Sequence, residues 1–207
     1  MTAVEAAGVE VVQRPPVPAS AGRSYPVGWW GMGWVIVTEA MVFAALLSGW
    51  FFLWAQSPDW PQGGIEKPHV GRILLFTVVL LGSSIPVVWG ERQLHRGRVG
   101  RLRIALLLTF LMGAVFLVNQ LLEYQQLPYT WTDNAYASMF YVITGLHGLH
   151  VLVGLVMNLV VQAKAWTGRV SPERDLTVRL WGMYWHFVDG VWIFVLSSLY
   201  LAVRWWA

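Results

Sequence analysis

The sequence lacks cysteine entirely and contains little charge, since charged residues make up only 12% of its 207 residues. The absence of cysteine excludes a disulfide framework, thiolate-ligated zinc, an iron–sulfur cluster and a cysteine nucleophile. A hydrophobic content of 57% is untypical of a soluble globular chain. The net charge of +3 is too small to indicate nucleic-acid binding. The composition therefore indicates a membrane protein without a nucleic-acid partner.

Five apolar stretches reach the roughly 20 residues that cross the hydrocarbon core of a bilayer. They lack the alternating pattern of barrel strands, so helices are expected. The predicted helices cover about residues 28–56, 71–91, 102–126, 135–164 and 179–204. We predict an all-α integral membrane protein, in which a bundle of five transmembrane helices (residues 28–207) follows a flexible, cytoplasmic N-terminal extension (residues 1–27).

The basic residues predict the orientation, because Lys and Arg accumulate in short cytoplasmic loops. Eleven of the fourteen would lie on one side of the membrane: Arg14, Arg23, Arg92, Arg96, Arg98, Arg101, Arg103, Lys164, Arg169, Arg174 and Arg179. We therefore expect a cytoplasmic amino terminus and an outside carboxyl terminus. The arginine-rich turn between the second and third helices suits anionic lipid headgroups or an acidic surface of another subunit.

Two carboxylates fall deep within apolar segments, Glu39 in the first helix and Asp189 in the fifth. At a rise of about 1.5 Å per residue, they lie roughly 17 Å and 15 Å from the starts of their helices, near the bilayer centre. A carboxylate there costs about 3 kcal/mol or more. Each is therefore expected to be protonated, paired, or turned toward protein and water.

Three histidines accompany these acids. His186 and Asp189 are three residues apart and share a helix face, and His147 and His150 repeat this spacing in the fourth helix. Both pairs are expected to act as polar contacts between helices. A metal or haem site built from these groups and Glu39 is the alternative, although the spacing matches no metal motif.

Gln120, Glu123 and Tyr124 end the third predicted helix. Glu123 lies about 30 Å from the start of that helix, so it is expected at the outer interface, where a charge is tolerated. The sequence contains no nucleophile elbow, phosphate-binding glycine loop or zinc-protease motif. No catalytic or metal-binding residue is predicted, and catalysis by this chain alone is not expected.

Five motifs of this sequence resemble motifs of the cytochrome c oxidase subunit III family and occur in the same order as in that family. The resemblance is to its short, five-helix bacterial form. The two most specific segments are residues 184–192, YWHFVDGVW, and residues 144–151, TGLHGLHV. Residues 38–43, TEAMVF, the pair Ser83-Ser84, and Gln120-x-x-Glu123-Tyr124 match further positions. The resemblance covers nearly all of residues 28–204.

The resemblance implies a non-catalytic subunit of a bacterial terminal oxidase that reduces dioxygen and pumps protons. Such a subunit has no haem or copper of its own, since these lie in partner subunits. It stabilises the catalytic subunit I, holds phospholipids and supports proton uptake. Subunit II, a small subunit IV and a respiratory supercomplex are further implied partners, in the bacterial inner (plasma) membrane. Glu39 matches the intramembrane carboxylate of the family, which reacts with carbodiimides.

Alternatives remain at this stage. Accessory subunits of quinol oxidases or nitric oxide reductases belong to the same family and are poorly separated by sequence. From a different class, a membrane haem carrier would use the histidines as axial ligands. A proton transporter would use Glu39 and Asp189 as conducting groups.

Overall fold

A computed structural model describes residues 26–66 and 70–206 of the chain, the last of these by its backbone alone. Residues 1–25 of the predicted N-terminal extension, which include Arg14 and Arg23, lie outside the described residues. Lys67 lies outside them too. Within the described ranges the regular structure is helical, apart from one isolated bridge between Ser171 and Arg174.

Five helical segments are long and apolar enough to cross a membrane, which confirms the predicted fold class. They are α1 (Val27–Gln56), α2 with α3 (Val70–Gly82 and Ser84–His95), α4 (Val99–Gln126), α5 (Ala135–Trp166), and α6 (Leu176–Val195) continued by η3 (Leu196–Leu201) and α7 (Ala202–Trp206). A short 3₁₀ turn, η2 (Gln62–Gly64), lies in the first connection.

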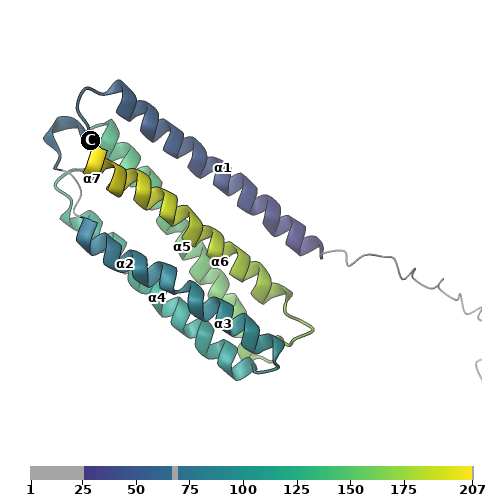
Figure 1. Cartoon of the computed structure of the whole chain (residues 1–207). Coiled ribbons are helices and arrows are strands. Elements are labelled where there is room, and N and C mark those ends of the chain that lie inside the picture. The colour runs from purple at the N-terminus through teal and green to yellow at the C-terminus, as the bar shows by residue number, and fades with distance from the viewer. Residues whose placement is uncertain (1–25, 67–69, 207) are drawn as a thin grey trace, which may run out of the picture.

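The helices form two layers (Figure 1). One layer contains α6 and the α2–α3 pair and the other contains α5 and α4, while α1 packs along one edge of the bundle against both α6 and α5. Helix α6 is central, because it packs against α1, α3 and α5. Helix α1 begins at one end of the bundle and the chain ends at the other.

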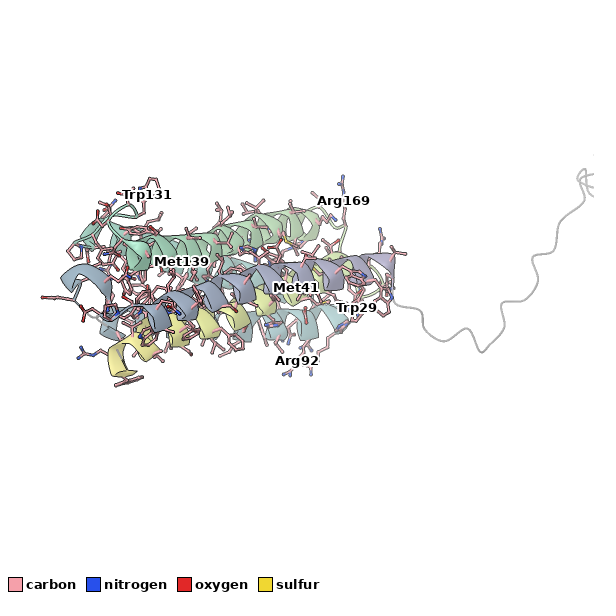
Figure 2. All side chains as sticks on the ribbon, turned by 90° about the horizontal axis from the view of Figure 1, so that it is seen from above. Trp29, Met41, Arg92, Trp131, Met139 and Arg169 are labelled. Carbon is pink, nitrogen blue, oxygen red and sulfur yellow. The ribbon has the colours of Figure 1, made fainter. Side chains whose placement is uncertain are left out.

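The outward surfaces of α4 and α5 are aliphatic. Exposed side chains on these helices include Leu107, Leu111, Val115, Leu152, Val156 and Leu159. Such faces match lipid chains, so their exposure costs nothing in a bilayer. Figure 2 shows Arg92 and Arg169 at the end of the bundle where Trp29 lies, and Trp131 at the opposite end.

The second transmembrane segment is interrupted at Ser83, between α2 and α3. Pro86 has no backbone N–H, so it cannot donate to the carbonyl one turn earlier, and this favours a break. The backbone N–H of Ser83 donates to the carbonyls of Val79 and Leu80 at 3.1 and 3.0 Å. The break turns the Ser83 and Ser84 hydroxyls toward α6. There the Ser83 hydroxyl accepts a hydrogen bond from Trp185, and the Ser84 hydroxyl bonds to both His186 and Asp189.

Helix α6 ends in the π-helical segment η3, whose wider turn holds one residue more than an α-helical turn. Four of its six side chains are buried, namely Leu196, Ser198, Leu199 and Tyr200. Burial of three consecutive residues, 198–200, exceeds what one face of a regular α-helix provides. The segment therefore turns Tyr200 inward, against α4 and α5.

Asn134 links the start of α5 to the first connection. Its side-chain oxygen accepts from the N–H of Ala137 at 2.9 Å, which caps the helix. Its amide nitrogen donates to the carbonyl of Gln62 at 3.1 Å. Gly63 adopts a φ of 73°, a left-handed conformation that glycine tolerates, and so brings the connection against α5.

Candidate functional site

Glu39 of α1 and His150 of α5 form a pair across two helices. Oε2 of Glu39 lies 3.0 Å from Nε2 of His150. Nδ1 of His150 lies 2.7 Å from the carbonyl oxygen of Leu146, and this oxygen only accepts, so Nδ1 carries a proton. One further proton then bridges Nε2 and the carboxyl group. The pair is neutral overall, either as two neutral groups or as an ion pair, which lowers the cost of its depth in the membrane.

The Glu39–His150 pair opens onto a surface pocket of about 350 Å³ between α1 and α5. Aliphatic side chains, including Val35, Leu149 and Val153, line most of this pocket. The Glu39 side chain is 37% exposed, so an apolar reagent dissolved in the bilayer can reach its carboxyl group. We refer to this feature as the α1–α5 pocket.

His147 lies in a different environment from His150. It is 1% exposed, and neither ring nitrogen has a hydrogen-bond partner among the described residues. Its ring packs against Trp192, Phe116 and Phe43, with centroid separations of 4.7, 6.0 and 6.4 Å. The two histidines that sequence spacing placed together therefore do not bond to each other, and His147 is an aromatic packing element.

His186 and Asp189 meet through a third residue, Ser84 of α3. The Ser84 hydroxyl donates to Oδ2 of Asp189 at 2.5 Å and lies 2.9 Å from Nδ1 of His186. Because the hydroxyl has one proton, which Asp189 receives, its oxygen accepts from Nδ1–H of His186. Oδ1 of Asp189 is buried and has no partner within the described part of the chain. We call these three residues the Ser84 cluster.

The neighbouring residues hold this cluster in place. The indole N–H of Trp185 donates to the Ser83 hydroxyl at 2.8 Å, and that of Trp192 donates to the Thr77 hydroxyl at 2.9 Å. These bonds join α6 to the second transmembrane segment on both sides of the break. Sequence spacing gave no sign of these bonds, because it does not reveal which helices are neighbours.

Gln120, Glu123 and Tyr124 lie where α4 meets three other elements. Glu123 accepts a hydrogen bond from the Tyr200 hydroxyl of η3 at 3.1 Å. Tyr124 donates to the Thr144 hydroxyl of α5 at 2.7 Å, since Thr144 uses its own proton on the Phe140 carbonyl. Gln120 is buried, and its side-chain amide lies close to the hydroxyls of Tyr124 and Tyr200.

Arg72 of α2 completes this end of the bundle and was not singled out from the sequence. Its guanidinium donates to Asn119 at 2.7 Å and to Gln126 at 2.6 Å, both on α4. The only signal for it was a basic residue on the side of the membrane with few others. The group therefore fastens helices α2, α4 and α5 and the π-helical segment near one membrane surface.

The titratable groups at membrane depth are dispersed. Glu39 lies with His150, His186 lies with Asp189, and His147 stands apart. No set of three or more His, Asp or Glu side chains converges within residues 26–66 and 70–206. The arrangement offers paired hydrogen bonds between helices and one carboxyl group accessible from the bilayer.

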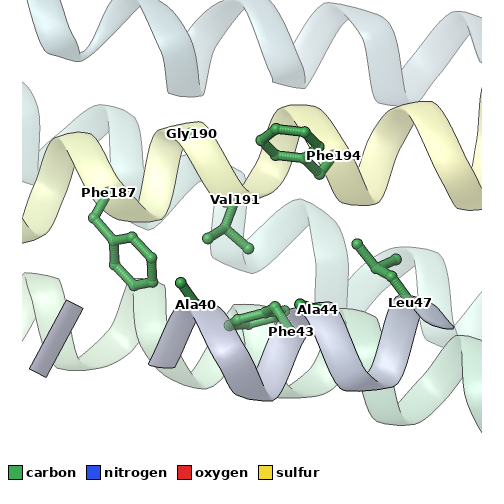
Figure 3. Close-up of a pocket in the computed structure, with 8 residues that line it drawn as sticks. All are labelled: Ala40, Phe43, Ala44, Leu47, Phe187, Gly190, Val191 and Phe194. Atoms are coloured by element: carbon green, nitrogen blue, oxygen red, sulfur yellow. The ribbon is translucent and has the colours of Figure 1, made fainter. Parts of the chain in front are cut away.

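A second pocket of about 400 Å³ separates α1 from α6 (Figure 3). Its lining is apolar and includes Ala40, Phe43 and Ala44 of α1 and Phe187, Gly190 and Phe194 of α6. A Cβ atom at Gly190 would meet nothing within 4 Å, so the pocket is open at this point. We refer to it as the α1–α6 pocket.

Known proteins resemble this chain in sequence over most of its length. The family model described as "Cytochrome c oxidase subunit III" matches residues 27–207. A cytochrome c oxidase subunit 3 from Lumbricus terrestris is 37% identical over 184 residues, which cover 86% of this chain and 69% of the relative. Proteins of the same name from Arabidopsis thaliana and Thermostichus vulcanus are 35% and 32% identical, and cover 83% and 82% of this chain and 65% and 84% of the relatives.

Proposed function

Because the chain belongs to the cytochrome c oxidase subunit III family, we propose that it is the accessory subunit III of a bacterial haem–copper terminal oxidase. The observation that carries this proposal is the family match over residues 27–207, which includes all five transmembrane segments. The relative from Thermostichus vulcanus is covered over 84% of its length, compared with 69% for that from Lumbricus terrestris. This difference supports the comparison with a shorter, five-helix bacterial form.

The chain is a multi-pass membrane protein, and we place it in the bacterial inner membrane with α1 beginning on the cytoplasmic side. Arg92 and Arg169 lie at the end of the bundle where α1 begins. Basic residues gather on the cytoplasmic side of short loops, which supports this orientation.

Membership in the family implies assembly with other oxidase subunits. In our proposal these are the catalytic subunit I, subunit II and a small subunit IV, within a larger respiratory assembly. Haem and copper belong to the partner subunits. The dispersion of the histidines supports this, since both ring nitrogens of His150 and one of His186 are already engaged.

Lipid binding and support of proton uptake form the modulatory part of the proposal. The α1–α5 pocket is apolar and open to the bilayer, so it suits an acyl chain of a phospholipid. Glu39 shares a proton with His150 at the edge of this pocket and is the candidate for a protonatable or lipid-contacting group.

Affinity purification in a mild detergent tests the proposal. A tag at the carboxyl terminus should recover the chain with a large subunit that shows haem absorption and contains copper. The separated chain should be colourless in the visible range. A Soret band that remains with the separated chain would indicate a haem carrier instead, and proton movement by the chain alone in liposomes would indicate a transporter.

A further inference from the structure

The Ser84 cluster leaves one hydrogen-bonding atom of an exposed side chain without a partner among the described residues. His186 is exposed, and its Nδ1–H is used by Ser84, so its Nε2 presents a free lone pair to the outside. No described residue donates to this nitrogen. Oδ1 of Asp189 also lacks a partner within the described ranges, but it is buried and therefore out of reach of a group outside the bundle. A polar group without a partner in an apolar environment costs about 1–3 kcal/mol, so the cluster favours an external partner.

The depth of the cluster excludes a lipid headgroup as that partner. Asp189 lies near the middle of the span Leu176–Trp205, about 20 Å from its start at 1.5 Å per residue. Headgroups begin about 15 Å from the bilayer centre, and acyl chains carry no hydrogen-bonding groups at that depth. A side chain from another transmembrane helix can reach the site and form the bond.

The surface around the cluster differs from the outward faces of α4 and α5. One and two turns after His186, α6 continues with Gly190 and Phe194, which line the α1–α6 pocket. On the other side of the cluster, Ile85 of α3 is 73% exposed, beside a hollow that includes Ser84 and Arg92. Helix α6 packs against both α1 and α3, and His186, Gly190 and Phe194 recur every four residues along it, so these features lie side by side on one face of the bundle.

Building on the proposed function, we propose that a transmembrane helix of the catalytic haem–copper subunit docks on the face formed by α1, α6 and α3. This helix presents a hydrogen-bond donor, such as a hydroxyl, amide or indole N–H, to Nε2 of His186. Its apolar side chains cover Phe194 and Ile85 and fill the α1–α6 pocket. The aliphatic faces of α4 and α5 remain in contact with lipid.

Site-specific photo-cross-linking in the intact complex tests this assignment. A benzophenone amino acid is placed at Ile85 or Phe194, and at Leu111 of α4 or Leu149 of α5 as controls. All four side chains are large, apolar and exposed, at 73%, 67%, 52% and 53%. The first two should cross-link to the haem–copper subunit at least tenfold more than the controls. Cross-links to that subunit only from the controls, or to lipid alone from all four, would overturn the assignment.

The hydrogen bond is tested separately. His186→Phe removes the acceptor with similar ring size, and His186→Gln supplies an amide oxygen in its place. We expect His186→Phe to weaken retention of the chain in the purified complex about three- to tenfold, and His186→Gln to restore part of it. The level of each variant in the membrane before purification controls for folding. Equal retention of His186→Phe and the unaltered chain would refute the hydrogen bond.

The outcomes separate this inference from the function it rests on. If the unaltered chain recovers no haem–copper subunit, the proposed function fails and the docking assignment falls with it. If it recovers that subunit but cross-links to it through α4 or α5, the function stands and the docking face is wrong.

Discussion

Replacing Gly154 with alanine should destabilise the bundle, because this glycine lies against the ring of Trp185. A Cβ atom at Gly154 would lie 2.9 Å from both Cε3 and Cζ3 of that ring. Carbon atoms in ordinary contact are about 3.5–4.0 Å apart, so the ring would have to retreat by roughly 0.6 Å or more. Retreat is opposed by Gly113 of α4, whose Cβ position is only 2.6 Å from Cη2 of the same ring.

The indole N–H of Trp185 also donates to the Ser83 hydroxyl at 2.8 Å. A shift of the ring would lengthen this hydrogen bond as well. Overpacking of this kind costs about 1–3 kcal/mol. Alanine in place of glycine recovers at most about 1 kcal/mol through helix propensity. We therefore expect a net loss of about 1–2 kcal/mol for Gly154→Ala, and a similar or larger loss for Gly113→Ala.

The matched control lies in the same helix. A Cβ at Gly148 would be 3.5 Å from Cδ1 of Leu117, which is an ordinary contact. Gly148→Ala should therefore change stability by no more than about 0.5 kcal/mol, or raise it slightly. Unfolding of the purified chain in mixed micelles by a denaturing detergent measures the three variants. Equal stability of Gly154→Ala and Gly148→Ala would refute the reasoning, whereas partial rescue by Trp185→Phe in the double variant would support it.

Three further predictions concern single polar groups. Glu39→Gln should leave the haem content of the purified complex normal while abolishing carbodiimide labelling of this subunit, and labelling that persists would show that another group reacts. Asp189→Leu should lower the amount of assembled complex more than the turnover of what assembles, because the Ser84 cluster joins α3 to α6; normal recovery of the subunit would argue against this. Two hydrogen bonds from Thr130 lower the pKa of Asp133, so the turn between α4 and α5 should hold at neutral pH and weaken only as the pH falls through that lowered pKa. A carboxyl NMR titration should therefore give a midpoint below the usual aspartate range, and an ordinary midpoint would contradict the turn geometry.

The transmembrane segments could be predicted because their length and apolar content are local properties of the sequence. The break at Ser83 and the π-helical segment η3 could not. The break lies inside a run that stays apolar on both sides of Pro86, and proline is tolerated within transmembrane helices when neighbours satisfy the freed groups. The π-helical turn depends on the packing of Tyr200 against α4 and α5.

The polar groups could be singled out from the sequence, but their partners could not. Spacing put His147 beside His150 and His186 beside Asp189, because residues three apart share a helix face. In the structure His150 instead forms a hydrogen bond with Glu39, 111 residues away, and His186 is joined to Asp189 through Ser84. These contacts depend on which helices are neighbours, and the spacing of residues along the sequence carries no record of that.

The π-helical turn at Leu196–Leu201 separates the registers of the two halves of the last membrane segment. Before it, the helix phase is set by Trp185 and Asp189, and after it by Tyr200 and its bond to Glu123. Deleting one residue from the turn would restore the α-helical bonding pattern and leave the helix beyond it at nearly the same length and phase, whereas the same deletion within the regular part of α6 would rotate everything beyond it by about 100°. A deletion in α6 would turn the Tyr200 hydroxyl toward hydrocarbon, but the π-helical turn can lose a residue while Tyr200 still faces Glu123, so this turn is where the last membrane segment tolerates a change of length.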